Sequence, residues 1–200
     1  MHRATIIAPL GLVETAPQEY RYALDGALAA CGGQTPFVIS HLPELIGEIR
    51  WRVPQPLPIG EARVILWVEP LVGVWRAELQ QIIAGMPSGG VLTVIASRPL
   101  AKQLPERRGW EQRALGLRVG GIRQLARALV SEGMMIEAEY GIHTTFGVGF
   151  NVLAEHADRR GSPERADQLR FAARLWYCRK GIDRWLSTVA LFVARKQGDR

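Results

Sequence analysis

Two stretches of the chain are apolar at nearly every position, and an amphipathic stretch separates them. The apolar stretches are Ala62–Val68 and Val91–Ala96. Between them, apolar residues recur at the spacing of one helix face: Trp75, Leu79, Ile82, Ile83 and Met86. Strands that are apolar on both faces are typical of a parallel sheet covered by helices. The pattern therefore predicts a βαβ unit whose helix runs over Val74–Gly85.

Similar patterns predict five further strands and three further helices. The strands are Ala4–Pro9, Thr35–Ser40, Ile49–Val53, Met134–Tyr140 and Ser187–Ala194. One helix begins near Thr15 and ends at Gly32, and another begins at Ser162 with a proline in its first turn. A third spans Gly121–Gly133, with an apolar stripe of Ile122, Leu125, Ala126, Leu129 and Val130. The stretch Thr144–Arg160 fits no single pattern. Because crossovers between parallel strands are right-handed, we predict a doubly wound, mostly parallel α/β sheet of seven strands.

Composition fits a single globular domain over residues 1–200. Hydrophobic residues make up 48% of the chain and charged residues 22%. No apolar run approaches the length of about 20 residues that spans a bilayer, and residues 1–9 lack the features of a signal peptide. We therefore expect a cytoplasmic protein without a transmembrane segment. The two cysteines, Cys31 and Cys178, form no CxxC motif, so we expect buried thiols and neither a disulfide nor a metal site.

The chain is basic, with a formal net charge of +6. Nearly all of the positive charge is arginine, concentrated between Arg98 and Arg184. One explanation is an anionic partner such as nucleic acid, phospholipid headgroups or an acidic protein. The other is that arginine occupies solvated helix faces, and no basic stripe with interleaved aromatic residues accompanies the charge. Composition leaves both explanations open.

Four stretches of the chain, one just before residue 62 and three within residues 62–196, resemble the class I S-adenosylmethionine-dependent methyltransferases. Pro56–Ile59 before Ala62 is similar to the approach to that family's fourth strand, and Met86–Leu92 to the entry of its fifth. Gly121–Tyr140 is similar to the helix and sixth strand, and Ser187–Lys196 to the closing strand. The resemblance implies a Rossmann-like sheet with its last strand antiparallel between the fifth and sixth. It also implies S-adenosylmethionine as cofactor and a small-molecule substrate.

The residues that match the family's cofactor site are reduced. The family has a glycine-rich turn after its first strand, and here the matching turn contains Leu10 and Gly11 with a single glycine. At the end of the second strand, Ser40 stands where the family has an acid for the ribose hydroxyls. Glu69 matches the acid found after the fourth strand. The resemblance therefore assigns Leu10, Gly11, Ser40 and Glu69 to cofactor binding.

Two further residues fall where the carboxyl ends of the strands meet, the edge at which such sheets bind ligands. Arg98 follows the strand Val91–Ala96 and has the charge to hold an anionic group of a substrate. In the family, the loop after the sixth strand also reaches this edge, which brings in His143. Glu69 and His143 are an acid and a base by residue type. The alternative is that these residues are solvated charges and a strand end, and no catalytic motif identifies a catalytic residue.

Two functions remain open from the sequence. The first is an S-adenosylmethionine-dependent methyltransferase that acts on a small molecule. The second is a catalytically inactive, methyltransferase-like binding or scaffold protein with an anionic partner. Whether the chain is an enzyme, and in what oligomeric state, the sequence does not determine, because fold alone does not specify function.

Overall fold

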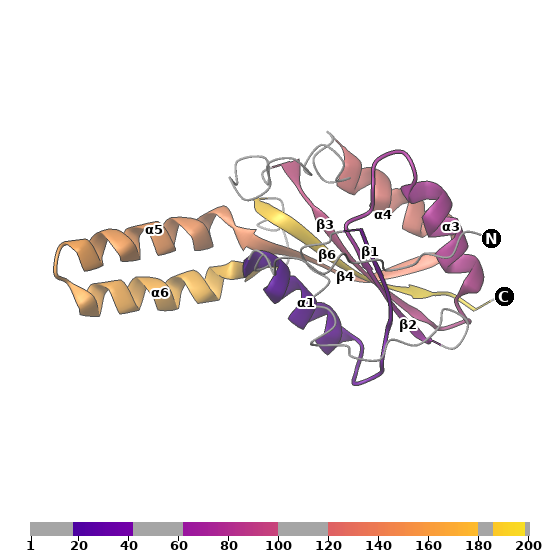
Figure 1. Ribbon diagram of the computed structural model, residues 1–200, viewed down its shortest axis with the longest axis horizontal. Helices are drawn as coiled ribbons and strands as arrows, with labels where there is room; N and C mark the ends of the chain where they lie inside the picture. The colour runs from indigo at the N-terminus through magenta and orange to yellow at the C-terminus, as the bar shows by residue number, and fades with distance from the viewer. Residues whose placement is uncertain (1–17, 42–61, 100–119, 180–185, 199–200) are drawn as a thin grey trace, which may run out of the picture.

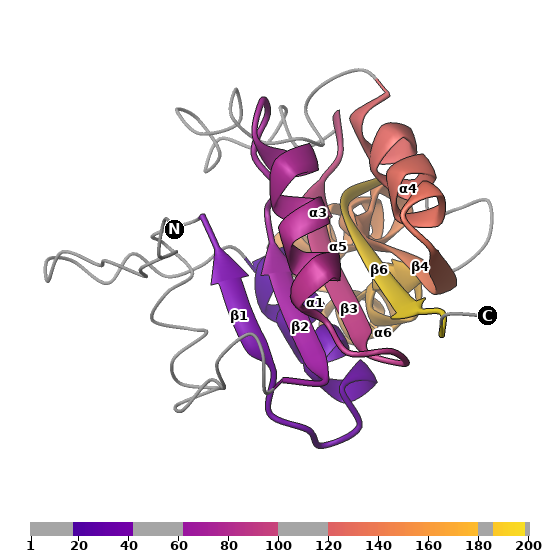
Figure 2. The same cartoon turned by 90° about the vertical axis from the view of Figure 1, so that its right-hand side faces the viewer.

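One mixed α/β sheet organises the part of the chain that the computed structural model describes, residues 18–41, 62–99, 120–179 and 186–198. The sheet has six strands in the order β1-β2-β3-β6-β4-β5, and the first five of this order are labelled in Figures 1 and 2. In chain order they are Phe37–Ser40 (β1), Val64–Val68 (β2), Val91–Ser97 (β3), Met134–Thr144 (β4), Cys178–Arg179 (β5) and Ser187–Lys196 (β6). Strands β1, β2 and β3 are parallel, and β6 runs antiparallel to both of its neighbours.

Helices cover both faces of the sheet. They are Gln18–Ala30 (α1), Trp75–Gly85 (α3), Gly121–Ser131 (α4), Thr145–Arg159 (α5) and Pro163–Tyr177 (α6). Helix α1 packs on one face, and α3 and α4 pack side by side on the other (Figure 2). Helices α5 and α6 form an antiparallel hairpin that extends away from the sheet (Figure 1). The sheet is thus the middle layer of three, the arrangement of Rossmann-like α/β folds.

The predicted centre of the sheet is confirmed. Strands β2 and β3 are parallel neighbours, and every residue of both is buried, as expected for strands that are apolar at nearly every position. Strand β6 lies antiparallel between β3 and β4, as the resemblance implies. The predicted strands Ala4–Pro9 and Ile49–Val53 lie outside the described residues, and the two-residue β5 was not predicted. The described part of the sheet therefore has six strands, and the count of seven stays a prediction.

The position of β1 corrects one assignment. The sequence pattern makes Thr35–Ser40 the second strand of the sheet, but β1 pairs directly with β2, in the register Phe37 to Ile65 and Ser40 to Val68. In the usual doubly wound order 3-2-1-4-5-6, the strand beside the fourth is the first. Pairing order depends on contacts between distant segments, so the local pattern could not reveal it. Strand β1 therefore occupies the first-strand position, and its carboxyl end lies beside the carboxyl end of β2.

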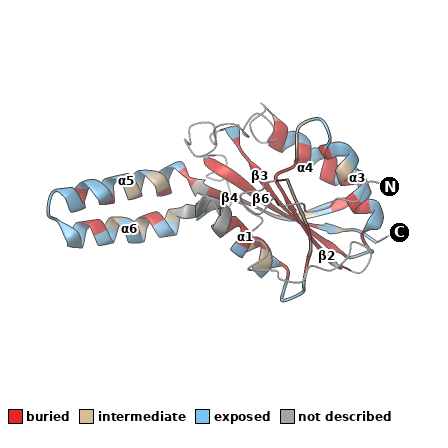
Figure 3. Ribbon diagram, viewed as in Figure 1, coloured by how far each residue is buried: buried red, intermediate tan, exposed pale blue. Residues whose placement is uncertain are grey.

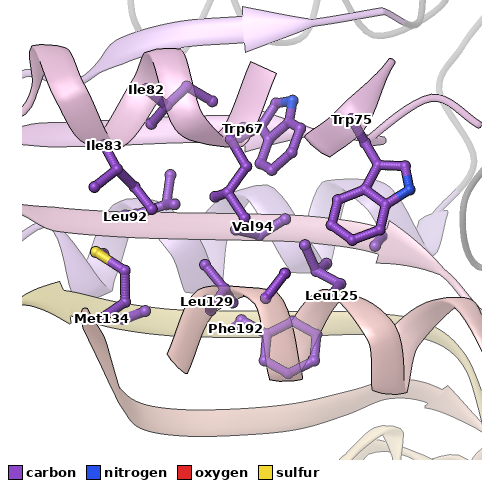
Figure 4. Close-up of a cluster of buried hydrophobic side chains, with 14 of the residues drawn as sticks. Trp67, Trp75, Ile82, Ile83, Leu92, Val94, Leu125, Leu129, Met134 and Phe192 are labelled. Atoms are coloured by element: carbon purple, nitrogen blue, oxygen red, sulfur yellow. The ribbon is translucent and has the colours of Figure 1, made fainter. Parts of the chain in front are cut away.

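The larger hydrophobic cluster lies between the sheet and helices α3 and α4 (Figure 4). Helix α4 contributes Ile122, Leu125 and Leu129, as predicted, but Val130 is 60% exposed and Ala128 is buried instead. Successive helix residues are about 100° apart, so a face centred on Leu125 and Leu129 turns Val130 toward solvent. The predicted apolar stripe was therefore wrong to include Val130.

A β-bulge switches the faces of β4. The pairing with β6 shifts between Ile136 and Ala138, which leaves Glu137 as the extra residue. Before the bulge, Met134 and Ile136 pack in the cluster under α3 and α4; after it, Tyr140 packs in the cluster under α1. Side chains alternate with a period of two along a strand, so a single inserted residue has this effect. Glu137 itself pairs with Arg195 of β6, with its Oε1 2.5 Å from the guanidinium Nε.

The two cysteines differ in environment. Cys31 is buried at the end of α1, its Sγ donates to the carbonyl oxygen of Ala27 at 3.1 Å, and burial raises the pKa of its thiol to about 11. Cys178 is exposed, which corrects the prediction of two buried thiols. It begins the two-residue strand β5 at the edge of the described sheet.

The orientation of α4 gives a test of the core. Leu125→Ala removes a side chain that is fully buried, and we expect the free energy of unfolding to fall by about 2–5 kcal/mol. Arg127→Ala, on the exposed face of the same helix, should change it by less than about 0.5 kcal/mol. Urea titration followed by far-ultraviolet circular dichroism measures both. Equal losses for the two variants would show that the helix faces the sheet differently.

Thiol reactivity gives a second test. Only thiolate reacts with Ellman's reagent, and a thiol with a pKa of about 11 is almost entirely protonated at pH 8. In the folded protein at pH 8, Cys178 should therefore react rapidly and Cys31 should not. One equivalent should react without denaturant and two in guanidinium chloride. Rapid reaction of two equivalents in the folded protein would contradict the burial of Cys31, and Cys178→Ser identifies the remaining thiol.

Candidate ligand-binding site

The carboxyl ends of four strands meet at one edge of the sheet. Strands β1, β2 and β3 are parallel, and β4 runs in the same direction because both β3 and β4 are antiparallel to β6. The residues at this carboxyl edge are Ser40, His41, Glu69, Ser97, Arg98 and Thr144. In open α/β sheets ligands bind outside this edge, at the point where the strand order reverses. In the usual order that point lies between the strands in the positions of β1 and β2.

Glu69 ties the end of β2 to the end of β3. It is fully buried and has a φ of 57°, the left-handed region that side chains other than glycine rarely adopt. Its carboxylate accepts from the backbone N–H of Ser97 at 3.1 Å and from the Ser97 hydroxyl at 2.9 Å. Its own N–H donates to the carbonyl oxygen of Ile95 at 2.7 Å. The strained backbone turns this carboxylate sideways along the edge, toward β3.

Arg98 and Glu139 form a second buried contact at the edge. The Arg98 side chain is 3% exposed, and its Nη2 donates to Glu139 Oε1 of β4 at 2.7 Å. The backbone N–H of Arg98 donates to the carbonyl oxygen of Thr188 in β6 at 2.8 Å. The side chain therefore reaches across β6, the strand that separates β3 from β4. A buried guanidinium needs such a partner, because an uncompensated buried charge is strongly unfavourable.

A third polar pair lies at the end of β1. His41 Nε2 is 2.7 Å from Glu78 Oε1 in the first turn of α3, and each side chain is about three-quarters buried, at 25% and 23% exposure. The other carboxylate oxygen, Glu78 Oε2, is buried and has no hydrogen-bond partner among the described residues. The indole Nε1 of Trp67 in β2 is also buried and has no hydrogen-bond partner among the described residues. Buried polar atoms are almost always hydrogen-bonded, so each of these two atoms is an exception within the described part of the chain.

The structure brings together some of the predicted site residues. Ser40 and Glu69 end neighbouring strands, since Ser40 pairs with Val68. Arg98 and His143 lie in one row of the sheet, on either side of Thr188 in β6. Leu10 and Gly11 lie outside the described residues.

Two residues of this edge were missed by the sequence analysis, Glu78 and Glu139. Glu78 carried a usable signal: it stands in the first turn of a helix that follows a parallel strand, and such turns lie near the carboxyl edge. Glu139 carried none. The bulge at 137 decides which face it presents, and the bulge is not visible in the sequence.

The described residues contain no helix long and apolar enough to cross a membrane. Within the same residues, no group of three or more histidine, cysteine, aspartate or glutamate side chains is arranged to hold a metal ion.

Comparison with known proteins gives likenesses of structure. No family model matches the sequence, and no curated protein sequence matches it. The [4+2]-cyclase SpnF matches over 95% of this chain and 86% of its own, with 11% identity and a TM-score of 0.45. A 16S rRNA (adenine(1408)-N(1))-methyltransferase from Catenulisporales acidiphilia, crystallised with its cosubstrate S-adenosylmethionine, matches over 72% of this chain and 58% of its own, with 16% identity and a TM-score of 0.32. At these scores the likenesses carry no argument about function, which has to come from the carboxyl edge itself.

The Glu69 contact can be tested by substitution. Glu69→Ala leaves the buried N–H and hydroxyl of Ser97 without this acceptor, and we expect the free energy of unfolding to fall by about 1–3 kcal/mol for each. Glu69→Gln keeps one acceptor oxygen and should lose less. Glu155→Ala, at an exposed position of α5, is the control and should change stability by less than about 0.5 kcal/mol. If Glu69→Ala matched this control in urea titrations, the carboxylate would not hold the two strand ends together.

Proposed function

We propose that the chain is an S-adenosylmethionine-dependent methyltransferase acting on a small molecule, with its cofactor at the carboxyl ends of β1 and β2. The observation that supports this most is the Glu78 carboxylate oxygen, which is buried beside His41 without a hydrogen-bond partner among the described residues. It lies next to the strand in the first-strand position, where a doubly wound sheet holds a nucleotide.

The donors and acceptors at this place suit an adenosyl ligand. Ribose hydroxyls are hydrogen-bond donors, and an acid at the carboxyl edge is the usual acceptor for them in nucleotide-binding sheets. Ser40 cannot supply a carboxylate, but Glu78 approaches the end of the same strand from α3. In this proposal the acid that holds the ribose hydroxyls therefore comes from helix α3 and not from the end of a strand.

In this proposal the chain's residues act mainly by binding and orientation. S-adenosylmethionine supplies an electrophilic methyl group, and alignment of that group with a nucleophile accounts for most of the catalysis. Arg98 and His143, in one row of the sheet, are the proposed substrate residues. An anionic group of the substrate would compete with Glu139 for the Arg98 guanidinium, which now bonds to that carboxylate. Glu69 would act by fixing the ends of β2 and β3.

One observation favours the second function, a binding or scaffold protein that does not transfer methyl groups. Two of the charged groups at the edge already have partners within the protein, Glu69 with Ser97 and Arg98 with Glu139. A site that has lost its ligand would keep such contacts, because they stabilise the strand ends. The partner would then recognise the basic surface of the chain, and S-adenosylmethionine would not bind.

Thermal unfolding with S-adenosylmethionine separates the two functions. A ligand that binds only the folded protein stabilises it by about 2.7 kcal/mol at a hundredfold excess over Kd, so we expect a rise in Tm. Glu78→Gln should reduce the rise, because it replaces one acceptor oxygen by an amide. Glu155→Gln, an exposed carboxylate of α5, should leave the rise unchanged.

Two outcomes would change the assignment. If millimolar S-adenosylmethionine does not raise the Tm of a folded sample, the methyltransferase proposal fails and the binding protein is favoured. If the rise persists in Glu78→Gln and disappears in Gly11→Val, the cofactor binds at the predicted turn of Leu10 and Gly11. A side chain at Gly11 would occupy the space that the ligand needs there.

A further inference from the structure

The hairpin of α5 and α6 has small residues inside and large apolar residues outside. Among the residues of the two helices whose burial is described, the buried ones are all glycine or alanine: Gly147, Ala154, Ala157, Ala166 and Ala173. Large apolar side chains of the same helices are about half exposed or more: Phe146, Val152, Leu153, Phe171 and Leu175. Along most of its length the hairpin is covered by no other described element (Figures 1 and 3). This arrangement reverses the usual distribution of a packed helix pair.

Two of these exposed residues, Phe146 and Leu153, lie on one side of the hairpin together with four partly buried residues, whereas Val152, Phe171 and Leu175 point elsewhere. In α5, Phe146, Phe150 and Leu153 are spaced by four and three residues, and so fall on one side of the helix. In α6, Leu169, Ala172 and Trp176 have the matching spacing. The rings of Phe146 and Trp176 lie 5.3 Å apart, which puts the two rows on the same side of the hairpin. We call these six residues the apolar face.

Charged contacts occupy the opposite face. Arg170 of α6 bonds to Asp158 of α5 and to Asp167 of its own helix. Arg159 pairs with Glu155 along α5 at 3.6 Å. From the 100° step of a helix, these residues lie on the side away from Phe146 and Trp176. The hairpin therefore has one face with cross-linked charges and one apolar face that contains no carboxylate.

We propose that the apolar face binds the same face of a second copy of this chain, so that two hairpins form a four-helix bundle. The alternating spacing of three and four residues in both rows is the pattern that helices use to pack against helices. A 15-residue helix is about 22 Å long and two packed helices are about 20 Å wide, so each copy contributes about 440 Å² in projection. The pair hides about 900 Å² or more, which suits a weak, reversible dimer.

The two hairpins are arranged head to tail in this dimer. Arg165, near the tip, lies on the side of the apolar face. A two-fold axis perpendicular to the hairpin puts the two copies of Arg165 at opposite ends of the bundle, whereas a parallel arrangement would bring them together. A lipid surface fits the apolar face less well, because binding to lipid does not require the same spacing of three and four residues on both helices. Membrane binding is therefore an outcome that the test must separate from dimerisation.

Sedimentation velocity of the full chain from 1 to 200 μM tests the proposal. We expect a reversible monomer–dimer equilibrium in the micromolar range. Leu153→Glu places a charge in the apolar face and should weaken dimerisation at least tenfold. Val152→Glu is the matched control: Val152 is the neighbouring residue and is 60% exposed, but it points away from the apolar face. It should leave the equilibrium unchanged.

A second pair of variants repeats the test on α6. The variants are Ala172→Glu and Phe171→Glu. Ala172 belongs to the apolar face, whereas its neighbour Phe171 is 63% exposed and lies outside that face. The first should abolish dimers and the second should not. A wild-type chain that is monomeric at 200 μM, or equal effects within either pair, would overturn the proposal. If that monomer instead co-sediments with vesicles of phosphatidylcholine and phosphatidylglycerol, and Leu153→Glu prevents it, the face binds lipid and not a second copy.

Discussion

The sheet depends on β6, the strand that enters it last. It lies antiparallel between β3 and β4, and all eight residues of Ser187–Ala194 are buried. Without it, β4 would have no partner on that side, and within the described residues its remaining pairing would be the two residues of β5. The three hydrophobic clusters also include residues of β6: Val189 and Leu191 in one, Phe192 in the largest and Val193 in the third. A strand buried on both faces and hydrogen-bonded on both edges is the most constrained element that a sheet can have.

The centre of the fold could be predicted from the sequence because its signals are local. An apolar run such as Val64–Val68 is readable as a buried strand wherever it falls in the sheet, and the stripe of α3 is readable as a helix face. The place of β1 beside β2 was not readable, because it depends on which segments pair across the chain. Only 23 residues, 41–63, join these two strands. Three crossovers of at least about ten residues each would separate the first strand from the fourth in the usual order. The 23 residues between β1 and β2 are too few for three such crossovers, so their number does not fit the usual strand order.

The candidate site was predicted less well than the fold, and the reason is electrostatic. The sequence shows where a charged residue lies along a strand, but it does not show which residue pairs with that charge. Glu69 and Arg98 were expected to face a ligand. Glu69 instead bonds to Ser97 at the end of the adjacent strand, 28 positions away, and Arg98 bonds across β6 to Glu139, 41 positions away. Such partners become adjacent only through strand pairing. The buried oxygen of Glu78 was missed for the same reason, since it becomes notable only when α3 packs beside the end of β1.

The hairpin shows how helices can form with little apolar burial between them. An alanine contact removes much less apolar surface from water than a leucine contact, so the seam of α5 and α6 contributes little by itself. The helix ends compensate in part. The Thr144 side chain accepts from the N–H of Gly147, and Pro163 begins α6 at a position where a missing N–H has no cost. The Thr144 hydroxyl also donates to the carbonyl oxygen of Trp176, which joins the two helices where they leave the sheet. The helix ends, this polar junction and the ion pair of Arg170 with Asp158 thus hold the hairpin, and its large side chains remain available for contacts outside it.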